Sequence, residues 1–294
     1  MGIDVTNSNL FCPATFIVAA ISASVLASGS PNATGKVEYP QKSTNSLSQI
    51  TVCGVDIASP PFFIFSYLDT PEEGEHKGAA YDIIGEVSIQ IGINIIIKRY
   101  PWKRCLIYLK DGSIDGVMGA SYLKERSDFG HYPLKDNGDV DYERSIYSND
   151  YWLYTNEESV VWDGETLMLP NDGIAGTGLG YSSAKLLNDL GAEVFEAHSP
   201  STLVSMLMSQ EIAVIAGYAK QLEPHFEPYH HSVGIKSDSI RKLNIPLAQD
   251  NMFLLVSKQF YQTHKSMTER IWNIFSDIHK DGRYQEIINS YMED

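Results

Sequence analysis

The chain has 294 residues, a length that usually divides into two domains because single hydrophobic cores rarely grow past about 250–300 residues. Apolar residues make up 43% and charged residues 20%, which excludes a fibrous or wholly disordered chain. The formal charge of −15, from 37 acidic and 22 basic side chains, argues against a nucleic-acid partner, because neutralising phosphates requires clustered Lys and Arg.

Residues 1–27 are typical of a secretory signal peptide. The run from Phe11 to Ala27 has no charged residue and is shorter than the ~20 residues that span a bilayer. Asp4 and the lack of Lys or Arg before this run are unusual for a signal, so an uncleaved membrane anchor is the alternative. Residues 28–48 are rich in Ser, Thr, Asn, Gly and Pro and predict a disordered linker. We therefore expect export to the periplasm and a folded body that begins at Gln49.

From Gln49 onward, predicted strands and helices alternate. Strands are expected over 50–55, 93–97 and 114–118, and helices over 81–91 and 102–112, each helix ending at a glycine. Strand–helix–strand alternation within about 70 residues indicates βαβ units and a mainly parallel sheet.

The same pattern restarts in the second half of the chain. Strands are expected at 174–175, 193–195 and 212–216, with helices at 183–190 and 202–208 between them. The β runs Tyr151–Tyr154 and Met252–Val256 could each cross between lobes, and residues 267–292 have helical spacing. The fold class is therefore α/β, with two lobes joined by a two-strand hinge and a ligand cleft between them. Lobe 1 would hold residues 49–152 and 251–294, and lobe 2 residues 153–250.

Cysteine and histidine usage predicts no metal or other cofactor. Cys12 lies in the expected signal, and Cys53 and Cys105 fall on predicted buried elements, where a disulfide and unpaired packing are both open. His225, His230 and His231 come closest together among the histidines but lack the spacing of a zinc helix.

Candidate binding residues follow the predicted strands, because small ligands bind at the carboxyl ends of parallel strands. They are Asp56 and Phe62 after the first strand, Trp102 after the second, Ser121 and Arg126 after the third, and Tyr181 and Ser182 at the end of the second-lobe segment 176–182. A guanidinium can hold a carboxylate through two parallel hydrogen bonds. Aromatic rings offer flat faces, and Asp56 could receive an ammonium.

The segment Gly-Thr-Gly-Leu-Gly at 176–180 is glycine-rich and precedes a helix, so its backbone N–H groups could meet an anion. It lacks the Lys-Ser/Thr of a P-loop and the acidic residue of a dinucleotide site, which argues against nucleotide binding. Each candidate also has an ordinary structural explanation: a surface ion pair for Arg126, core packing for Trp102 and a turn for the Ser-Pro-Pro before Phe62.

Several motifs occur in a fixed order: ITVCGVDIASPPFFIF, PWKRCLIYLKDGSIDGVMGAS, SYLKER and IHKDGRYQEIINSY. Over Ile50 to Tyr291, the chain resembles the family 3 extracellular solute-binding proteins, the receptors for polar amino-acid uptake by ABC transporters. The resemblance implies the type II periplasmic-binding-protein fold. It implies that Arg126 binds a ligand carboxylate with Ser121 beside it, and that Asp56 and Trp102 contact the ligand. Tyr181 and Ser182 would complete carboxylate recognition from the second lobe.

One position departs from the family pattern. The family usually carries an Asp after the last second-lobe strand to pair with the ligand's α-ammonium, whereas this chain has Tyr218 there. Tyr218 is therefore the eighth residue expected to contact the ligand. Stranding an ammonium without its partner costs ~3–5 kcal/mol. Therefore either Asp56 or Glu223 supplies the charge, or the ligand is not a standard α-amino acid.

The resemblance implies a monomeric periplasmic receptor for a small carboxylate-bearing polar ligand, an amino acid or a derivative. Lobe closure would deliver the ligand to the permease of an ABC importer. The alternatives are a ligand-sensing partner of a membrane receptor and, because a few relatives are enzymes, a cyclohexadienyl-dehydratase-like activity that would use Asp56 or Glu223. We expect the chain to be a binding protein and not an enzyme.

Overall fold

The computed structural model describes residues 47–65, 76–170, 173–226 and 240–292. The expected signal peptide and nearly all of the expected linker lie outside these residues, as do His230 and His231. Residues 46–294 form one compact unit, to which the description below refers. Among the described residues, no helix is both long and apolar enough to cross a membrane.

The first lobe is built on parallel strands β1 (Gln49–Val55), β2 (Asn94–Tyr100) and β3 (Gly116–Ser121), in the spatial order β2-β1-β3. They are connected by α1 (Ala79–Ile91) and α2 (Trp102–Asp111). Each helix ends at a glycine in the left-handed conformation, Gly92 (φ 71°) and Gly112 (φ 78°), a backbone state that other residues rarely adopt. The predicted alternation of strands and helices is therefore confirmed in this lobe.

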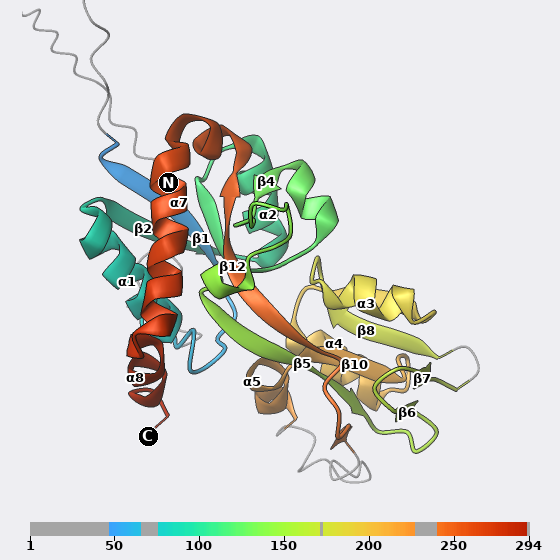
Figure 1. The fold of residues 1–294 in the computed structure, drawn as a ribbon. Helices are drawn as coiled ribbons and strands as arrows, with labels where there is room; N and C mark the ends of the chain where they lie inside the picture. Colours follow the sequence, from blue (N-terminus) through green and yellow to red (C-terminus); the bar gives the residue numbers. More distant parts are fainter. Residues whose placement is uncertain (1–46, 66–75, 171–172, 227–239, 293–294) are drawn as a thin grey trace, which may run out of the picture. The chain divides into compact units, whose positions relative to one another are not determined.

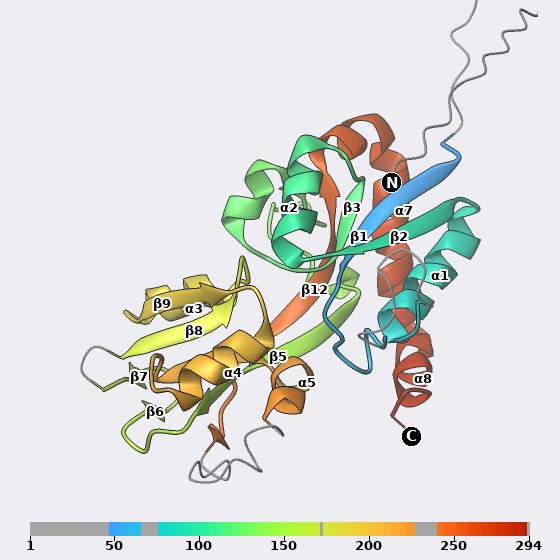
Figure 2. The ribbon, with the colours of Figure 1, turned by 180° about the vertical axis from the view of Figure 1, so that it is seen from behind.

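The chain returns to the first lobe to end in α7 (Lys258–Lys280) and α8 (Arg283–Asn289). The helical segment begins earlier than the expected residue 267, because Ser257 caps α7 by accepting a hydrogen bond from the Phe260 N–H. Gly282, in the left-handed conformation, separates the two helices. Helices α1, α7 and α8 lie on one side of the first-lobe sheet and α2 on the other (Figures 1 and 2).

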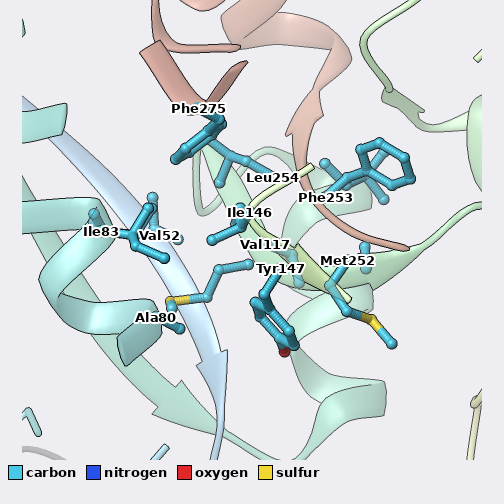
Figure 3. Packing of buried hydrophobic residues seen from close by; sticks show 14 of the residues in the cluster. Val52, Ala80, Ile83, Val117, Ile146, Tyr147, Met252, Phe253, Leu254 and Phe275 are labelled. Carbon is cyan, nitrogen blue, oxygen red and sulfur yellow. The ribbon is translucent and has the colours of Figure 1, made fainter. Parts of the chain in front are cut away.

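A continuous hydrophobic core fills the first lobe. Figure 3 shows Val52 of β1, Ile83 of α1 and Phe275 of α7 around the fully buried Ile146. A Cys53–Cys105 disulfide joins β1 to α2 through this core, with the Cα atoms 5.6 Å apart. Of the two states that the sequence left open, the structure has the bridge.

The second lobe contains β8 (Ile174–Gly178), β9 (Glu193–Ala197) and β10 (Val214–Tyr218), which run parallel in the order β10-β8-β9. The helices α3 (Ser183–Asp189) and α4 (Pro200–Met208) pack against this sheet, and the short α5 (Ala219–Leu222) follows β10. The sheet divides the lobe's apolar residues into two separate clusters, one with Leu187 of α3 and the other with Leu203 of α4. Two-residue strands complete the set: β4 (Gly130–His131), β6 (Val161–Trp162), β7 (Leu167–Met168) and β11 (Arg241–Lys242).

Two long antiparallel strands, β5 (Tyr147–Thr155) and β12 (Ala248–Ser257), connect the lobes (Figure 1). They pair with each other from Ala248↔Tyr151 to Met252↔Tyr147, and this paired segment is the hinge. The runs expected to cross lie on these two strands and overlap the hinge at Tyr151 and Met252. Tyr151–Tyr154 also pairs with β10, and Met252–Val256 with β3. The lobe boundaries expected at residues 152 and 250 fall within these strands and stay predictions.

Candidate ligand-binding cleft

The cleft between the lobes has an inner and an outer chamber, separated by Trp102, Tyr181 and Gln221, which line both. The inner chamber borders the hinge, since it is lined by Tyr147, Asn149 and Tyr151 of β5 and by Met252 of β12. Its other lining residues are Val55, Ser59, Phe63, Met118, Gly119, Ser121 and Tyr218. The outer chamber is lined among others by Asp56, Lys103, His198 and Ser199.

Tyrosines give the inner chamber its chemical character. Tyr151 of the hinge stacks on Tyr218 of β10, with ring centroids 4.2 Å apart. Tyr147 also lines the chamber and lies at the edge of the first-lobe core in Figure 3, beside Met252. Burial raises the pKa of Tyr147, Tyr151 and Tyr218, so all three hydroxyls are neutral at physiological pH. The chamber therefore offers aromatic faces and uncharged hydroxyl groups.

Arg126 lies in a 3-10 turn (Lys124–Asp128) directly after β3, and only 4% of it is exposed. Nη1 donates to the Ser121 carbonyl at 2.7 Å and to Ser121 Oγ at 3.2 Å. Nη2 donates across the cleft to the carbonyl of Gly180 at 2.9 Å. The guanidinium carbon lies 5.3 Å from the Trp102 ring centroid, within the range of a cation–π contact. Arg126 is thus a buried cation held at the boundary between the lobes.

The Gly180 carbonyl accepts a second hydrogen bond from the first lobe, from Trp102 Nε1 at 2.9 Å. Gly180 itself lies in the turn between β8 and α3 with φ 78°. The glycine-rich segment was expected to offer free N–H groups before the helix. This expectation is wrong for three consecutive amides. The Leu179 N–H donates to the Ala197 carbonyl, the Gly180 N–H to Glu196 Oε2 and the Tyr181 N–H to the Gly178 carbonyl. At Gly180 the turn presents an acceptor to the first lobe, with its donor already engaged.

A chain of hydroxyl groups continues from Arg126 across the cleft. Ser121 Oγ donates to Ser182 Oγ at 2.6 Å, which joins the two lobes. Ser182 Oγ in turn lies within donor distance of Asp250 Oδ2 (3.0 Å) and of the Tyr151 hydroxyl (3.2 Å). Burial raises the pKa of Asp250, and the Ser182 hydrogen bond, the Arg126 charge and a Ser121 hydrogen bond oppose the rise. A guanidinium and a carboxylate therefore lie at opposite ends of two serine hydroxyls.

Six of the eight residues expected in the site lie together around this chain: Trp102, Ser121, Arg126, Tyr181, Ser182 and Tyr218. Asp56 lies apart from them in the outer chamber. Burial raises the pKa of Asp56, and the positive charges of Arg104 and Arg99 oppose this rise. Phe62 packs behind the chamber by stacking on Tyr147 at 4.0 Å, and its neighbour Phe63 lines the inner chamber instead. Their contacts with a ligand stay predictions.

Sequence reasoning missed Asp250, Asn149 and Gln221. Asp250 and Asn149 face each other on the two hinge strands, and Asn149 lines the inner chamber. Glu223, an alternative to Asp56 as the site's acid, accepts a hydrogen bond from the Tyr154 hydroxyl at 2.8 Å and lines neither chamber. Within the described parts of the chain, no group of three or more His, Cys, Asp or Glu side chains could hold a metal ion.

Comparison with known families supports the predicted architecture. Residues 51–294 match the model of the family described as bacterial extracellular solute-binding proteins, family 3. A search of curated proteins finds no match.

Solved structures similar to this chain include the substrate-binding protein of an amino-acid ABC transporter, with a TM-score of 0.58 and 15% identity over 84% of this chain and 100% of that one. A histidine kinase sensor domain similar to periplasmic binding proteins has a TM-score of 0.59 and 11% identity, covering 83% and 96%. The AbpA substrate-binding protein of Streptococcus pneumoniae, bound to L-arginine, has a TM-score of 0.58 and 12% identity, covering 83% and 94%. The predicted type II periplasmic-binding fold is therefore confirmed.

Proposed function

Because the chain belongs to the family 3 bacterial extracellular solute-binding proteins, we propose that it is a periplasmic receptor for a small carboxylate-bearing polar solute, an amino acid or a derivative. The main observation behind this proposal is the position of Arg126. Its guanidinium is buried between the lobes, and each hydrogen bond found for it goes to an uncharged oxygen of Ser121 or Gly180. A ligand carboxylate at this place would form stronger, charge-assisted bonds.

The ligand binds by replacing the Gly180 carbonyl at Arg126. Ser121 and Ser182, one from each lobe, hydrogen-bond the incoming carboxylate from either side, and the Trp102 ring packs on the ligand's carbon chain. Because these groups come from both lobes, the ligand favours the closed arrangement and shifts the population toward it.

The partner of the closed form is the permease of an ABC importer, as for the similar amino-acid-transporter protein. The second candidate is a membrane sensor, and the similarity to a histidine kinase sensor domain favours it. Both partners would recognise the same pair of closed lobes. Pull-down of membrane proteins with the ligand-loaded receptor would separate them, because it recovers a permease in one case and a signalling receptor in the other.

We assign no catalytic role to the cleft. Of the two carboxylic acids that a dehydratase-like activity would use, Glu223 is engaged by Tyr154 and lies away from both chambers. Asp56 remains as a half-buried carboxyl group in the outer chamber.

Thermal unfolding in the presence of the twenty protein L-amino acids, simple amines and small dicarboxylates tests the proposed function. A ligand at a hundred times its Kd stabilises the folded state by ~2.7 kcal/mol, which should raise Tm by roughly 5–10 °C for a domain of this size. At the same concentration the compound should stabilise the Arg126→Ala variant by at most ~0.4 kcal/mol, the value for a Kd about 100-fold higher. If no carboxylate in the panel shifts the wild-type Tm, the proposed function is wrong.

A further inference from the structure

We propose that Asp250 is the residue that receives the ammonium of the ligand, so that the cleft selects α-amino acids over carboxylates that lack the amino group. This inference rests on the proposed function and assigns a specificity-determining residue within the same site.

The hinge directs Asp250 toward the cleft. Side chains two residues apart on a strand lie on the same face, so Asp250 shares its face with Met252, which lines the inner chamber. Its cross-strand partner Asn149 also lines that chamber. Asp250 is not itself among the residues that line either chamber, but its Oδ2 lies 3.0 Å from Oγ of Ser182, the hydroxyl that joins Ser121 across the cleft.

Asp250 lies at the right place relative to Arg126. The connection runs from Arg126 Nη1 to Ser121 Oγ (3.2 Å), on to Ser182 Oγ (2.6 Å), and then to Asp250 Oδ2 (3.0 Å). An α-amino acid carries its carboxylate and its ammonium on a single carbon, so its two charges require a cation and an anion close together. Arg126 and Asp250, two hydroxyls apart, match that requirement.

The surroundings of Asp250 favour a cationic partner. It is half-buried, and no Lys, Arg or His nitrogen lies within ion-pair distance of it among the described residues. The adjacent rings of Tyr151 and Tyr218 attract a cation through their faces. A ligand ammonium would therefore pair with a carboxylate that burial has partly desolvated.

The other acids considered fit this task less well. Asp56 lies in the outer chamber and feels the charges of Arg104 and Arg99. Glu223 is already engaged, because it accepts a hydrogen bond from the Tyr154 hydroxyl. Neither contacts the serine pair that links the lobes, whereas Asp250 does.

The test uses the full chain and two ligand sets: the twenty protein L-amino acids and, for each of them, the analogue in which hydrogen replaces the α-amino group. Affinities are measured by calorimetry for the wild type, Asp250→Asn and Asp150→Asn. Asp150 is the matched control, because it is an aspartate on the neighbouring hinge strand one residue from Asn149, and so on the opposite face.

We expect the wild type to bind the amino acid roughly 100-fold more tightly than its analogue, since losing one member of a buried charged pair costs that much or more. Asp250→Asn should lower the affinity for the amino acid by a similar factor and leave the affinity for the analogue unchanged or higher. Asp150→Asn should bind both ligands with wild-type affinity. Amino-acid affinity should also fall in acid for the wild type and not for Asp250→Asn.

Each other outcome has a distinct meaning. Equal wild-type affinity for amino acid and analogue would overturn the role of Asp250 and leave the carboxylate receptor standing, and this comparison holds even if Asp250→Asn fails to fold. An Asp250→Asn variant that binds amino acids like the wild type would overturn it too. If the wild type binds neither set, the proposed function fails, and this inference fails with it.

Discussion

The two lobes bring different groups to the cleft. The first supplies a buried cation and an indole, Arg126 and Trp102, whereas the second supplies a backbone carbonyl at Gly180 and a hydroxyl at Ser182. The first-lobe groups are also fixed by their own lobe, since the Tyr132 hydroxyl donates to the same Ser121 carbonyl that Arg126 binds. The first lobe thus presents a cation and an indole, and the second lobe contributes the acceptors that these groups bind.

The largest expected effect of a change confined to the first lobe concerns the disulfide, because both of its cysteines belong to that lobe. The double variant Cys53→Ala and Cys105→Ala should lose about 4 kcal/mol of unfolding free energy, the chain-entropy value for a bridge between residues 52 apart. Urea unfolding followed by tryptophan fluorescence measures the loss. Reduced wild type should match the double variant; equal stability of the oxidised and reduced wild type would contradict the prediction.

The next prediction concerns the removal of the Arg126 guanidinium. Arg126→Ala should lower the affinity for a bound amino acid about 100-fold or more, because it removes a buried charged hydrogen-bond donor. Calorimetry measures the effect, and the exposed Arg270→Ala on α7 is the control for loss of an arginine. Unchanged affinity in Arg126→Ala would mean that the ligand does not use the guanidinium.

A smaller effect on stability is expected at Gly180, whose carbonyl is the second lobe's acceptor for Trp102 and Arg126. Gly180→Ala should destabilise the fold by about 1–2 kcal/mol, because an L-residue at φ 78° is strained. The added Cβ would also lie 3.3 Å from Lys103 Cδ and 3.5 Å from Trp102 Cδ1 across the cleft. Gly191→Ala is the matched control, with φ 83° and nothing within 4 Å. The Tm should therefore fall further in Gly180→Ala than in Gly191→Ala, and equal losses would mean that the cleft contact has no cost.

The smallest effect is the pH dependence of the free protein. Burial raises the pKa of Asp250 above its usual 3.8. Stability from this group is therefore fully present below the unfolded-state pKa and is lost as the pH rises through the higher folded-state value. As the pH falls from neutrality, the free energy of unfolding of the wild type, measured in urea, should rise relative to that of Asp250→Asn. The Asp150→Asn variant should show the same pH dependence as the wild type. A stability gap between wild type and Asp250→Asn that does not change with pH would contradict this assignment.

Most of the fold could be predicted from local patterns, since the apolar spacing and the glycines at 92 and 112 fix where helices begin and end. The glycine-rich segment was misjudged because Gly176 belongs to strand β8, where a Cβ would lie 2.5 Å from Ile212 and 2.9 Å from Leu203. Gly176 therefore serves close packing of side chains on the sheet, which a sequence motif does not distinguish from a ligand-binding loop.

The site was predictable where it follows strands of a βαβ unit, which gave Trp102, Ser121 and Arg126. Asp250 was not, because its position depends on the register between β12 and β5, strands about a hundred residues apart in the chain. Which face of a hinge strand meets the cleft is set by that pairing. The choice between Phe62 and Phe63 likewise depends on tertiary packing against Tyr147.

The Gly180 carbonyl has a consequence for what holds the two lobes together. Trp102 and Arg126 both donate to it from the first lobe. Part of the free energy that joins the lobes therefore comes from the chain's own hydrogen bonds. For the proposed receptor, a bound carboxylate would add only the difference between itself and this carbonyl as acceptors for Arg126.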